Sequence, residues 1–402
     1  MTAAIFLATF GVLAAGRAPL LRIDRTGAAI IGAVLMVVTG AIEFPDAVRA
    51  VDFPTLVLLF GMMIIVAHLR LAGGIALVAR AIGGGVQSRV RLLFALVFAA
   101  GLLSALFVND TICLVFTPVV LDLAAARRER PLPYLLALAT ASNIGSVATI
   151  TGNPQNMLIG SLSGISFARF AAALAPVAIA GLALDGAIIW ALFRRELSSS
   201  STAIVELPRV RTHRALLVKT LIVITGVLAA FLAGFNSAIV AVSGAAALLV
   251  TRRVRPSKIY AAIDWDLLVL FAGLFVVVGA GEQGGFDRRL FEWLRPLGVQ
   301  TVAGLSATAA VLSNAVSNVP AVMLFTRIVP RLPEPDRAWL TLAMSSTLAG
   351  NLTVLGSIAN LIVIEGARRR GVNVSFGDYA RVGLPLTVIT IIFGIVWLSW
   401  RL

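Results

Sequence analysis

Long apolar stretches alternate with short polar or basic breaks along the whole chain. Most of these stretches approach twenty residues, which is the length that a helix needs to cross the hydrocarbon core of a bilayer. They predict ten crossings, near residues 2–20, 26–42, 53–70, 133–160, 168–193, 214–234, 237–251, 264–281, 338–366 and 379–400. The pattern therefore predicts an all-α polytopic membrane protein.

Two further apolar stretches, about 90–125 and 300–327, carry polar groups at their middles. A polar group at the centre of a span is costly unless it faces protein or a wet cavity. We therefore expect two re-entrant hairpins, each of which returns to the side from which it entered.

Short sequences recur between the two halves. "GVLAA" occurs at 11–15 and 226–230, "AVDFPTLVLLFG" at 50–61 matches "AIDWDLLVLFAG" at 262–273, and "LLSALFVND" at 102–110 matches "VLSNAVSNV" at 311–319. A weaker match pairs Gly152 and Asn156 with Gly356 and Asn360. These recurrences predict a duplicated unit. Each unit has five crossings, so the second copy is inverted in the membrane.

Three segments follow from this duplication. We predict a first inverted repeat at 1–193, with scaffold spans in 1–71 and a hairpin and broken helix in 90–193. A basic cytoplasmic linker occupies 194–213. The second repeat is 214–402, with scaffold spans in 214–281 and a hairpin and broken helix in 300–402.

Composition supports the membrane class: 59% of the 402 residues are hydrophobic and only 13% are charged. The net charge of +14 comes in short clusters between apolar spans, without an aromatic-rich basic groove, which argues against nucleic-acid binding. If the N-terminus is outside, most Lys and Arg residues fall on the inner side, as cytoplasmic loops require. We therefore expect a multi-pass protein of the bacterial inner membrane with both termini outside.

Enzyme and metal chemistry find little support. The motifs HExxH, GxSxG and the Walker lysine motif do not occur, and the two histidines are far apart in the sequence. The single cysteine, Cys113, excludes a disulfide framework and a multi-thiolate metal site. We expect a transporter without a cofactor or metal site, and not an enzyme.

The segment "ATITGNPQNMLIG" (148–160) interrupts an apolar span. Pro154 removes a helical hydrogen bond, and Gly152 tolerates unusual backbone angles. The amides of Asn153, Gln155 and Asn156 supply donors and acceptors. A broken helix offers its positive amino-terminal end to an anion, while unwound carbonyls can hold a cation.

A reduced form of this interruption, "GNLTVLGSIAN" (350–360), occurs in the second half. Small and polar residues can also serve simply as helix-packing contacts. Two matched interruptions, however, are typical of a transporter's binding site near the bilayer midplane.

These residues resemble the ion transporter superfamily, which includes ArsB-type arsenite permeases, citrate transporters, NhaD-type sodium/proton antiporters and divalent anion/sodium symporters. "FVNDTICLVFTP" (107–118) and "SNVPAVMLF" (317–325) are similar to the two hairpin tips of that family, and "GNPQN" and "GSIAN" are similar to its two helix breaks. The resemblance covers essentially the whole chain. It implies a homodimer in which a scaffold supports a mobile unit of hairpins and broken helices, an elevator-type arrangement.

Two departures bear on the substrate. The divalent-anion branch typically carries Ser-Asn-Thr at both tips, whereas this chain has Val108-Asn109-Asp110 and Ser317-Asn318-Val319. An acidic tip disfavours a doubly charged anion unless a cation lies between them. "VNDT" is more similar to the arsenite and antiporter branches, but "GNPQN" departs from the Pro-Pro-Asn form of arsenite permeases.

Two buried acids are candidates for ion coupling. Asp185 lies nine residues before Arg194, or roughly 13 Å inside that boundary at the helical rise, and an aspartate near the bilayer centre is usually functional. Its coupling ion would be sodium or a proton. A bundle-facing aspartate paired with a hydroxyl is the alternative. Asp110 is placed at a hairpin tip, whereas Asp52 and Asp264 start matching spans and are expected to cap helices.

The sequence thus favours a secondary active permease for a small inorganic or organic anion, arsenite-efflux or citrate/carboxylate-like. A sodium/proton antiporter is the alternative within transport. An anion channel, or a membrane subunit driven by a separate cytoplasmic ATPase, is the alternative of another class. The candidate substrate- and ion-binding residues are Asn109, Asp110, Thr111, Asn143, Thr151, Gly152, Asn153, Pro154, Asn156, Ser317, Asn318, Gly356, Ser357 and Asn360.

Overall fold

A computed structural model describes residues 1–16, 22–86, 88–198, 212–250 and 253–401. All regular elements in these ranges are helices, which confirms the predicted all-α membrane class. Most of the predicted linker 194–213, and the end of the first predicted crossing, lie outside the described residues.

The helices of the first half follow the predicted crossings closely. They are α1 (Thr2–Ala15), α2 (Arg25–Val38), α3 (Phe44–Ala50), α4 (Phe53–Leu71), α5 (Gly74–Gly85), α6 (Arg89–Leu106), α7 (Asn109–Ala126), α8 (Leu132–Ser146), η1 (Ile150–Gly152), α9 (Pro154–Ser163), α10 (Phe167–Leu192) and α11 (Arg194–Leu197).

The second half repeats this order of elements. It contains α12 (Arg214–Leu232), α13 (Ser237–Leu249), α14 (Pro256–Tyr260), α15 (Trp265–Gln283), α16 (Phe286–Leu294), η2 (Arg295–Leu297), α17 (Val302–Val316), α18 (Asn318–Phe325), η3 (Val329–Arg331), α19 (Pro335–Leu348), η4 (Ala349–Asn351), η5 (Val354–Gly356), α20 (Ile358–Arg368) and α21 (Phe376–Arg401).

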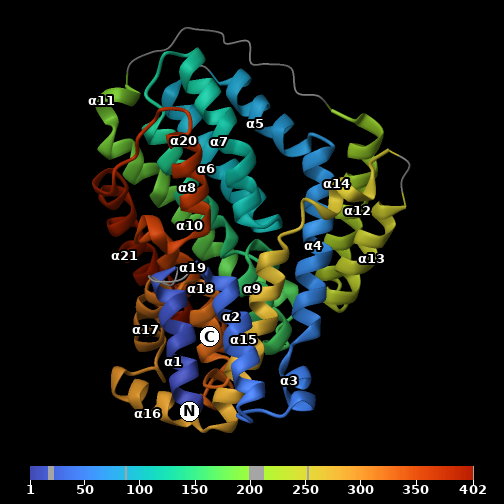
Figure 1. Ribbon diagram of the computed structural model, residues 1–402. Helices are drawn as coiled ribbons and strands as arrows, with labels where there is room; N and C mark the ends of the chain where they lie inside the picture. The colour runs from blue at the N-terminus through green and yellow to red at the C-terminus, as the bar shows by residue number, and fades with distance from the viewer. Residues whose placement is uncertain (17–21, 87, 199–211, 251–252, 402) are drawn as a thin grey trace.

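Helices α4 and α15, which carry the matching sequences of the two halves, run in opposite directions, and each packs against a helix of the other half. In Figure 1, α4 rises from α3 at the bottom to α5 at the top, whereas α15 descends from α14 to α16. Helix α4 packs against α13, and α2 packs against α15. Both α4 and α15 begin with the expected aspartate cap: Asp52 accepts from the backbone N–H of Thr55 and Asp264 from that of Leu267.

Helices α6 and α7 form a hairpin whose two ends lie on the same side. Arg89, at the start of α6, forms an ion pair with Glu129, just after α7, at 3.0 Å. Arg127 also donates to the carbonyl of Gly83, at 2.8 Å. The tip carries Asn109, which contacts the broken span α8–α9 next to its break, so the hairpin reaches the middle of that span.

Helices α17 and α18 form the second hairpin. After α18 the chain returns to the junction of α15 and α16, where Arg327 forms an ion pair with Glu282 of α15 at 3.0 Å and Arg331 with Asp287 of α16 at 2.6 Å. The turn between the two helices is made by Ser317. Both apolar stretches with polar middles therefore fold as hairpins.

Among the described residues, seven helices are long and apolar enough to cross a membrane: α4, α6, α7, α10, α12, α15 and α21. Helices α1, α2 and α13 are apolar but have only 14, 14 and 13 residues, and two further predicted crossings are the broken pairs α8–α9 and α19–α20. The count of ten crossings stays a prediction.

The basic ends of several elements meet on one side of the molecule. Arg130 pairs with Glu196 at 2.7 Å and Arg370 pairs with Asp122, which joins the ends of α7, α11 and α20. Figure 1 shows this end, with α5, α11 and α14, opposite the end that carries α3, α16 and the N-terminus. An inward orientation of the basic end remains our prediction from the charge rule.

Cysteine labelling tests this orientation. We expect Thr2→Cys to react with a membrane-impermeant maleimide added to intact cells, and Ser198→Cys to react only after permeabilisation. Native Cys113 is fully buried, so the unmodified chain serves as the blank. The reverse labelling pattern would place the termini inside and contradict the prediction.

Candidate functional site

The first helix break lies between α8 and α9. Helix α9 starts with Pro154 at its first position, where no N–H is needed, and its N-cap Asn153 accepts from the backbone N–H of Asn156 at 2.8 Å. Gly152 is required here because a Cβ would lie 2.2 Å from the carbonyl oxygen of Ser146. The sequence GNPQN therefore forms a tight, buried helix start.

The unwound backbone of each break is held by one asparagine in the same way. Asn156 Nδ2 donates to the carbonyls of Ser146 and Thr149, both at 3.0 Å. Asn360 Nδ2 donates to the carbonyls of Gly350 and Thr353, at 2.8 and 3.1 Å. Each residue of the second set lies 204 positions after its counterpart in the first. The weaker sequence match thus corresponds to two equivalent structures.

The two breaks also bond to each other with the same symmetry. Asn153 Nδ2 donates to Thr347 Oγ1 at 3.1 Å, and Ser357 Oγ donates to Asn143 Oδ1 at 2.9 Å. Positions 153 and 357, like 143 and 347, differ by 204. Each N-cap side chain therefore contacts the opposite half, which brings both helix breaks into one buried site.

Asn143 is the centre of this site. Its Oδ1 accepts from Asn109 Nδ2 at 2.9 Å and from Ser357 Oγ, while its Nδ2 donates to Asn351 Oδ1 at 2.8 Å and to Asn360 Oδ1 at 3.0 Å. All four hydrogen-bonding positions of the amide are filled. One side chain thus joins the first hairpin tip to both halves. We call the following group the amide cluster: Asn109, Asn143, Asn153, Asn156, Thr347, Asn351, Ser357 and Asn360.

The amide cluster is buried and neutral. None of its side chains is more than 6% exposed, and none takes part in an ion pair among the described residues. Helices α9 and α20 start at its N-caps Asn153 and Ser357, so their positive ends point into it. The arrangement offers donors, acceptors and partial positive charge without a full charge.

The structure places Asp110 and Thr111 elsewhere. They line a cavity of about 70 Å³ between the hairpin tip and helices α4 and α15, together with Arg70 and Asp264. Thr151 hydrogen-bonds the carbonyl of Ala105 at 3.5 Å. These three candidates lie beside the amide cluster and do not bond to it.

The second hairpin tip differs from the first. Ser317 has φ +78° and ψ +158°, a conformation that L-residues rarely adopt and that costs on the order of 1–3 kcal/mol. The next side chain, Asn318, has a buried Oδ1 without a hydrogen-bond partner. A Cβ on Gly350 would lie 3.5 Å from Asn318 Nδ2, so this tip lies beside the second break. Asn318 Oδ1 is therefore a buried acceptor that no described donor uses in this conformation.

Gly356 lies at the position equivalent to Gly152. A Cβ there would lie 2.9 Å from both Asn314 Oδ1 and the carbonyl of Gly350. The second break is therefore nearly as tightly packed as the first, although its neighbour Asn314 is a side chain that can move.

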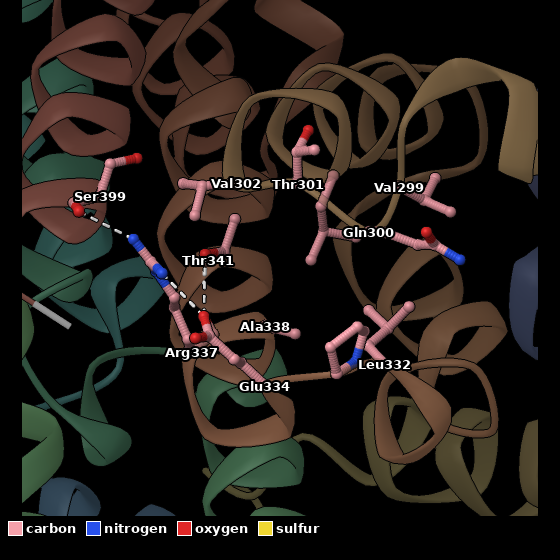
Figure 2. A pocket seen from close by; sticks show the side chains of 12 residues that line it. Val299, Gln300, Thr301, Val302, Leu332, Glu334, Arg337, Ala338, Thr341 and Ser399 are labelled. Carbon is pink, nitrogen blue, oxygen red and sulfur yellow. Dashed lines mark hydrogen bonds and ion pairs between the residues drawn. The ribbon is translucent and has the colours of Figure 1, made fainter.

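A larger pocket, of about 370 Å³, lies at the start of α19 (Figure 2). Arg337 lines this pocket. Its guanidinium group donates to the Glu334 carboxylate at 2.7 Å and to the carbonyls of Ser399 and Leu398 at 2.9 and 3.1 Å. Arg337 is ten residues before Thr347, or about 15 Å along the helix. This pocket is therefore separate from the amide cluster and its charge is neutralised.

Sequence reasoning missed Asn351 and Thr347, both central to the site. Asn351 lies within the quoted run "GNLTVLGSIAN", and Thr347 is the counterpart of Asn143 at the 204-residue offset. Applying that offset to every polar residue near the first break would have found Thr347. Asn351 has Val147 at its equivalent position, so the repeat gives no signal for it.

Apolar helices, two hairpins and two broken helices around a buried polar site define a multi-pass membrane transporter. The chain belongs to the CitMHS family, described as citrate transporters, whose family model matches residues 10–340. It is a member of a transporter family and not of an enzyme family.

Relatives with curated names span nearly the whole chain. It is 33% identical to the "Silicon efflux transporter LSI3" of Oryza sativa subsp. japonica, over 94% of this chain and 93% of the relative. It is 25% identical to the "Putative transporter arsB" of Dictyostelium discoideum, over 93% and 87%. The fold is similar to that of the Alcanivorax borkumensis YdaH transporter, with a TM-score of 0.61 and 16% identity over 99% of this chain and 96% of that one.

Proposed function

We propose that this protein is a secondary active transporter that moves a small inorganic or organic anion, or its uncharged acid, through the amide cluster. The observation that carries the proposal is the pair of equivalent helix breaks joined at Asn143. Movement of the hairpins and broken helices against a scaffold of α1, α2, α4, α12, α13 and α15 would expose the cluster to each side in turn. An ion gradient would drive this movement.

The neutral character of the cluster favours a small hydroxylated oxoacid over citrate. Burying a multiply charged carboxylate without a cationic partner is costly, whereas amides and hydroxyls pair well with hydroxyl groups. The names of two relatives, a silicon efflux transporter and a putative arsB transporter, support the same class of substrate. We propose arsenite and silicic acid as the first solutes to test.

Replacing the asparagine that holds each break tests the site. We expect Asn156→Ala and Asn360→Ala each to lower the initial rate of arsenite or silicic acid transport in proteoliposomes about tenfold, because each loses two hydrogen bonds to unwound backbone. Asn236→Ala is the matched control, since Asn236 is exposed and only caps α13. Unchanged transport rates in both variants would show that the amide cluster is not part of the transport path.

A sodium/proton antiporter is the second candidate. The cavity that Asp110 shares with Asp264 and Arg70 favours it, because two carboxylates there could exchange a cation. Sodium-driven proton flux without any added solute, lost in Asp110→Asn, would support the antiporter. A channel would instead give currents that need no coupling ion, and an ATPase-driven subunit would stay silent until its partner was added.

We also propose a homodimer in the bacterial inner membrane. Exposed apolar side chains on α12 and α13, such as Val218, Ile222 and Ile239, face lipid or a second copy in this arrangement. Mass measurement in detergent or nanodiscs distinguishes a dimer from a monomer.

A further inference from the structure

Asp185 is a fully buried carboxyl group in the middle of α10. Its Oδ1 lies 2.8 Å from Thr140 Oγ1 on α8, and its Oδ2 has no hydrogen-bond partner in the described part of the chain. It takes part in no ion pair among the described residues. An ionised carboxylate in this setting would be held by a single hydroxyl, which is far too little to replace its hydration.

Other titratable groups on the packed helices lie towards the helix ends. Helix α10 packs against α6, α8, α11, α12, α19 and α21. Together with α10 these carry Arg89, Arg91, Tyr134, Arg169, Arg194, Arg195, Glu196, Arg214, Lys219, Asp336, Arg337, Asp378, Tyr379, Arg381 and Arg401. Of these, Tyr379 lies close enough to Asp185 for an electrostatic interaction. Within the described parts of the chain, no Lys or Arg side chain forms an ion pair with the carboxyl group.

Hydrogen-bond geometry around Thr140 assigns a proton to Asp185. Thr140 Oγ1 lies 2.8 Å from the Leu136 carbonyl and also 2.8 Å from Asp185 Oδ1. A hydroxyl has one proton and can donate it at full strength to only one of two acceptors. Both short contacts are hydrogen bonds if Thr140 donates to Leu136 and a protonated Asp185 donates to Thr140.

The same threonine connects Asp185 to the amide cluster. The Thr140 carbonyl accepts from Asn351 Nδ2 at 3.2 Å, and Asn351 Oδ1 accepts from Asn143. Two residues, Thr140 and Asn351, therefore separate the carboxyl group from Asn143, the amide that joins both halves. A change at Asp185 that shifts the backbone of Thr140 would move the carbonyl that Asn351 bonds, whereas a turn of the Thr140 hydroxyl alone leaves that bond in place.

Helix α21 offers donors that an ionised Asp185 would need. Buried Thr387 Oγ1 and the Tyr379 hydroxyl have no hydrogen-bond partner among the residues that the structure describes. A Cβ on Gly181 would lie 3.5 Å from Thr390, and Trp397 donates to the carbonyl of Ala173, so α10 and α21 run antiparallel. Asp185 lies four residues after Gly181 on α10. Because the two helices are antiparallel, the residues of α21 opposite Asp185 lie about four positions before Thr390, at 386–387.

We propose that Asp185 is the proton-carrying group that couples transport to the proton gradient, with Thr140 as the positioning residue that links it to the amide cluster. The proposal deepens and rests on the proposed transport function. Asp185 is protonated in the present conformation. On release, the O–H bond of its carboxyl group breaks and the proton passes to water admitted in another conformation. Thr140 then turns its hydroxyl from Leu136 to the carboxylate, where Thr387 and Tyr379 add donors.

Gradient-free exchange separates coupling from binding. In proteoliposomes, we expect Asp185→Asn to exchange labelled for unlabelled arsenite within about twofold of wild type, since the amide cluster is intact. Wild type should accumulate arsenite up to about tenfold per pH unit if one proton moves per solute, and Asp185→Asn should not accumulate it. Accumulation that persists in Asp185→Asn, or that follows sodium instead of pH, overturns the proposal.

Infrared spectroscopy gives a readout that does not depend on the substrate. Wild type at neutral pH should show the C=O stretch of a protonated carboxylic acid that is missing in Asp185→Asn and displaced in Thr140→Val. Thr220→Val is the matched control, because Thr220 is equally buried and donates to the Leu216 carbonyl at 2.8 Å on scaffold helix α12. A wild type without this band refutes the proton assignment. A present band without any arsenite or silicic acid exchange refutes the proposed substrates instead.

Discussion

Asn143→Ala is expected to lower the transport rate at least about 100-fold and to destabilise the protein by at least about 3 kcal/mol. The substitution removes the acceptor of Asn109 and Ser357 and the donor of Asn351 and Asn360, all of them buried. Each buried group left without a partner costs about 1–3 kcal/mol. Thermal unfolding in detergent and solute exchange in proteoliposomes measure the two effects.

Asn143→Asp tests the hydrogen-bond pattern of the side chain without removing the side chain. It keeps the oxygen that accepts from Asn109 and Ser357 but replaces Nδ2 by a second oxygen that faces the oxygens of Asn351 and Asn360. We expect transport to fall as far as in Asn143→Ala, since donor and acceptor no longer alternate. The exposed cap variant Asn236→Ala should cost only about 1 kcal/mol. Wild-type stability and transport in both Asn143 variants would show that the cluster is packing alone.

The sequence was sufficient to locate both helix breaks and both hairpins. Proline, glycine and amides in an apolar span have few physical explanations, so Gly152, Pro154 and Asn156 were found directly. Polar groups at the middles of 90–125 and 300–327 predicted the hairpins for the same reason. Local chemistry therefore determined these elements without knowledge of the tertiary contacts.

Contacts between the halves were beyond the sequence. Asn351 has no polar counterpart in the first half, and only the approach of the second break to α8 places it in the site. Asp110 was expected beside Asn109 at the binding site, yet successive residues at a helix start point in different directions. Asn109 bonds to Asn143, whereas Asp110 lines the cavity next to Asp264. Which side chain of a tip contacts the helix break depends on packing that periodicity does not encode.

Gly152→Ala is expected to lower transport at least about 30-fold and stability by about 1–3 kcal/mol, the usual cost of overpacking. The new Cβ would lie 2.2 Å from the Ser146 carbonyl, a backbone atom that cannot swing away. That carbonyl accepts from Asn153 and Asn156, so any shift that relieves the clash also breaks the helix start. Rates of solute exchange and unfolding temperatures check both effects.

Two further glycines make this a graded series. At Gly356 the nearest atoms are 2.9 Å away and include the flexible end of Asn314, so Gly356→Ala should be milder than Gly152→Ala. Gly226 is in α12 with nothing within 4 Å of a Cβ, so Gly226→Ala should be neutral or stabilising by up to about 1 kcal/mol. Equal effects at Gly152 and Gly226 would mean that close backbone approach at the first break contributes nothing. The predicted order instead ties the loss of transport to the geometry of the break, because all three substitutions add the same methyl group.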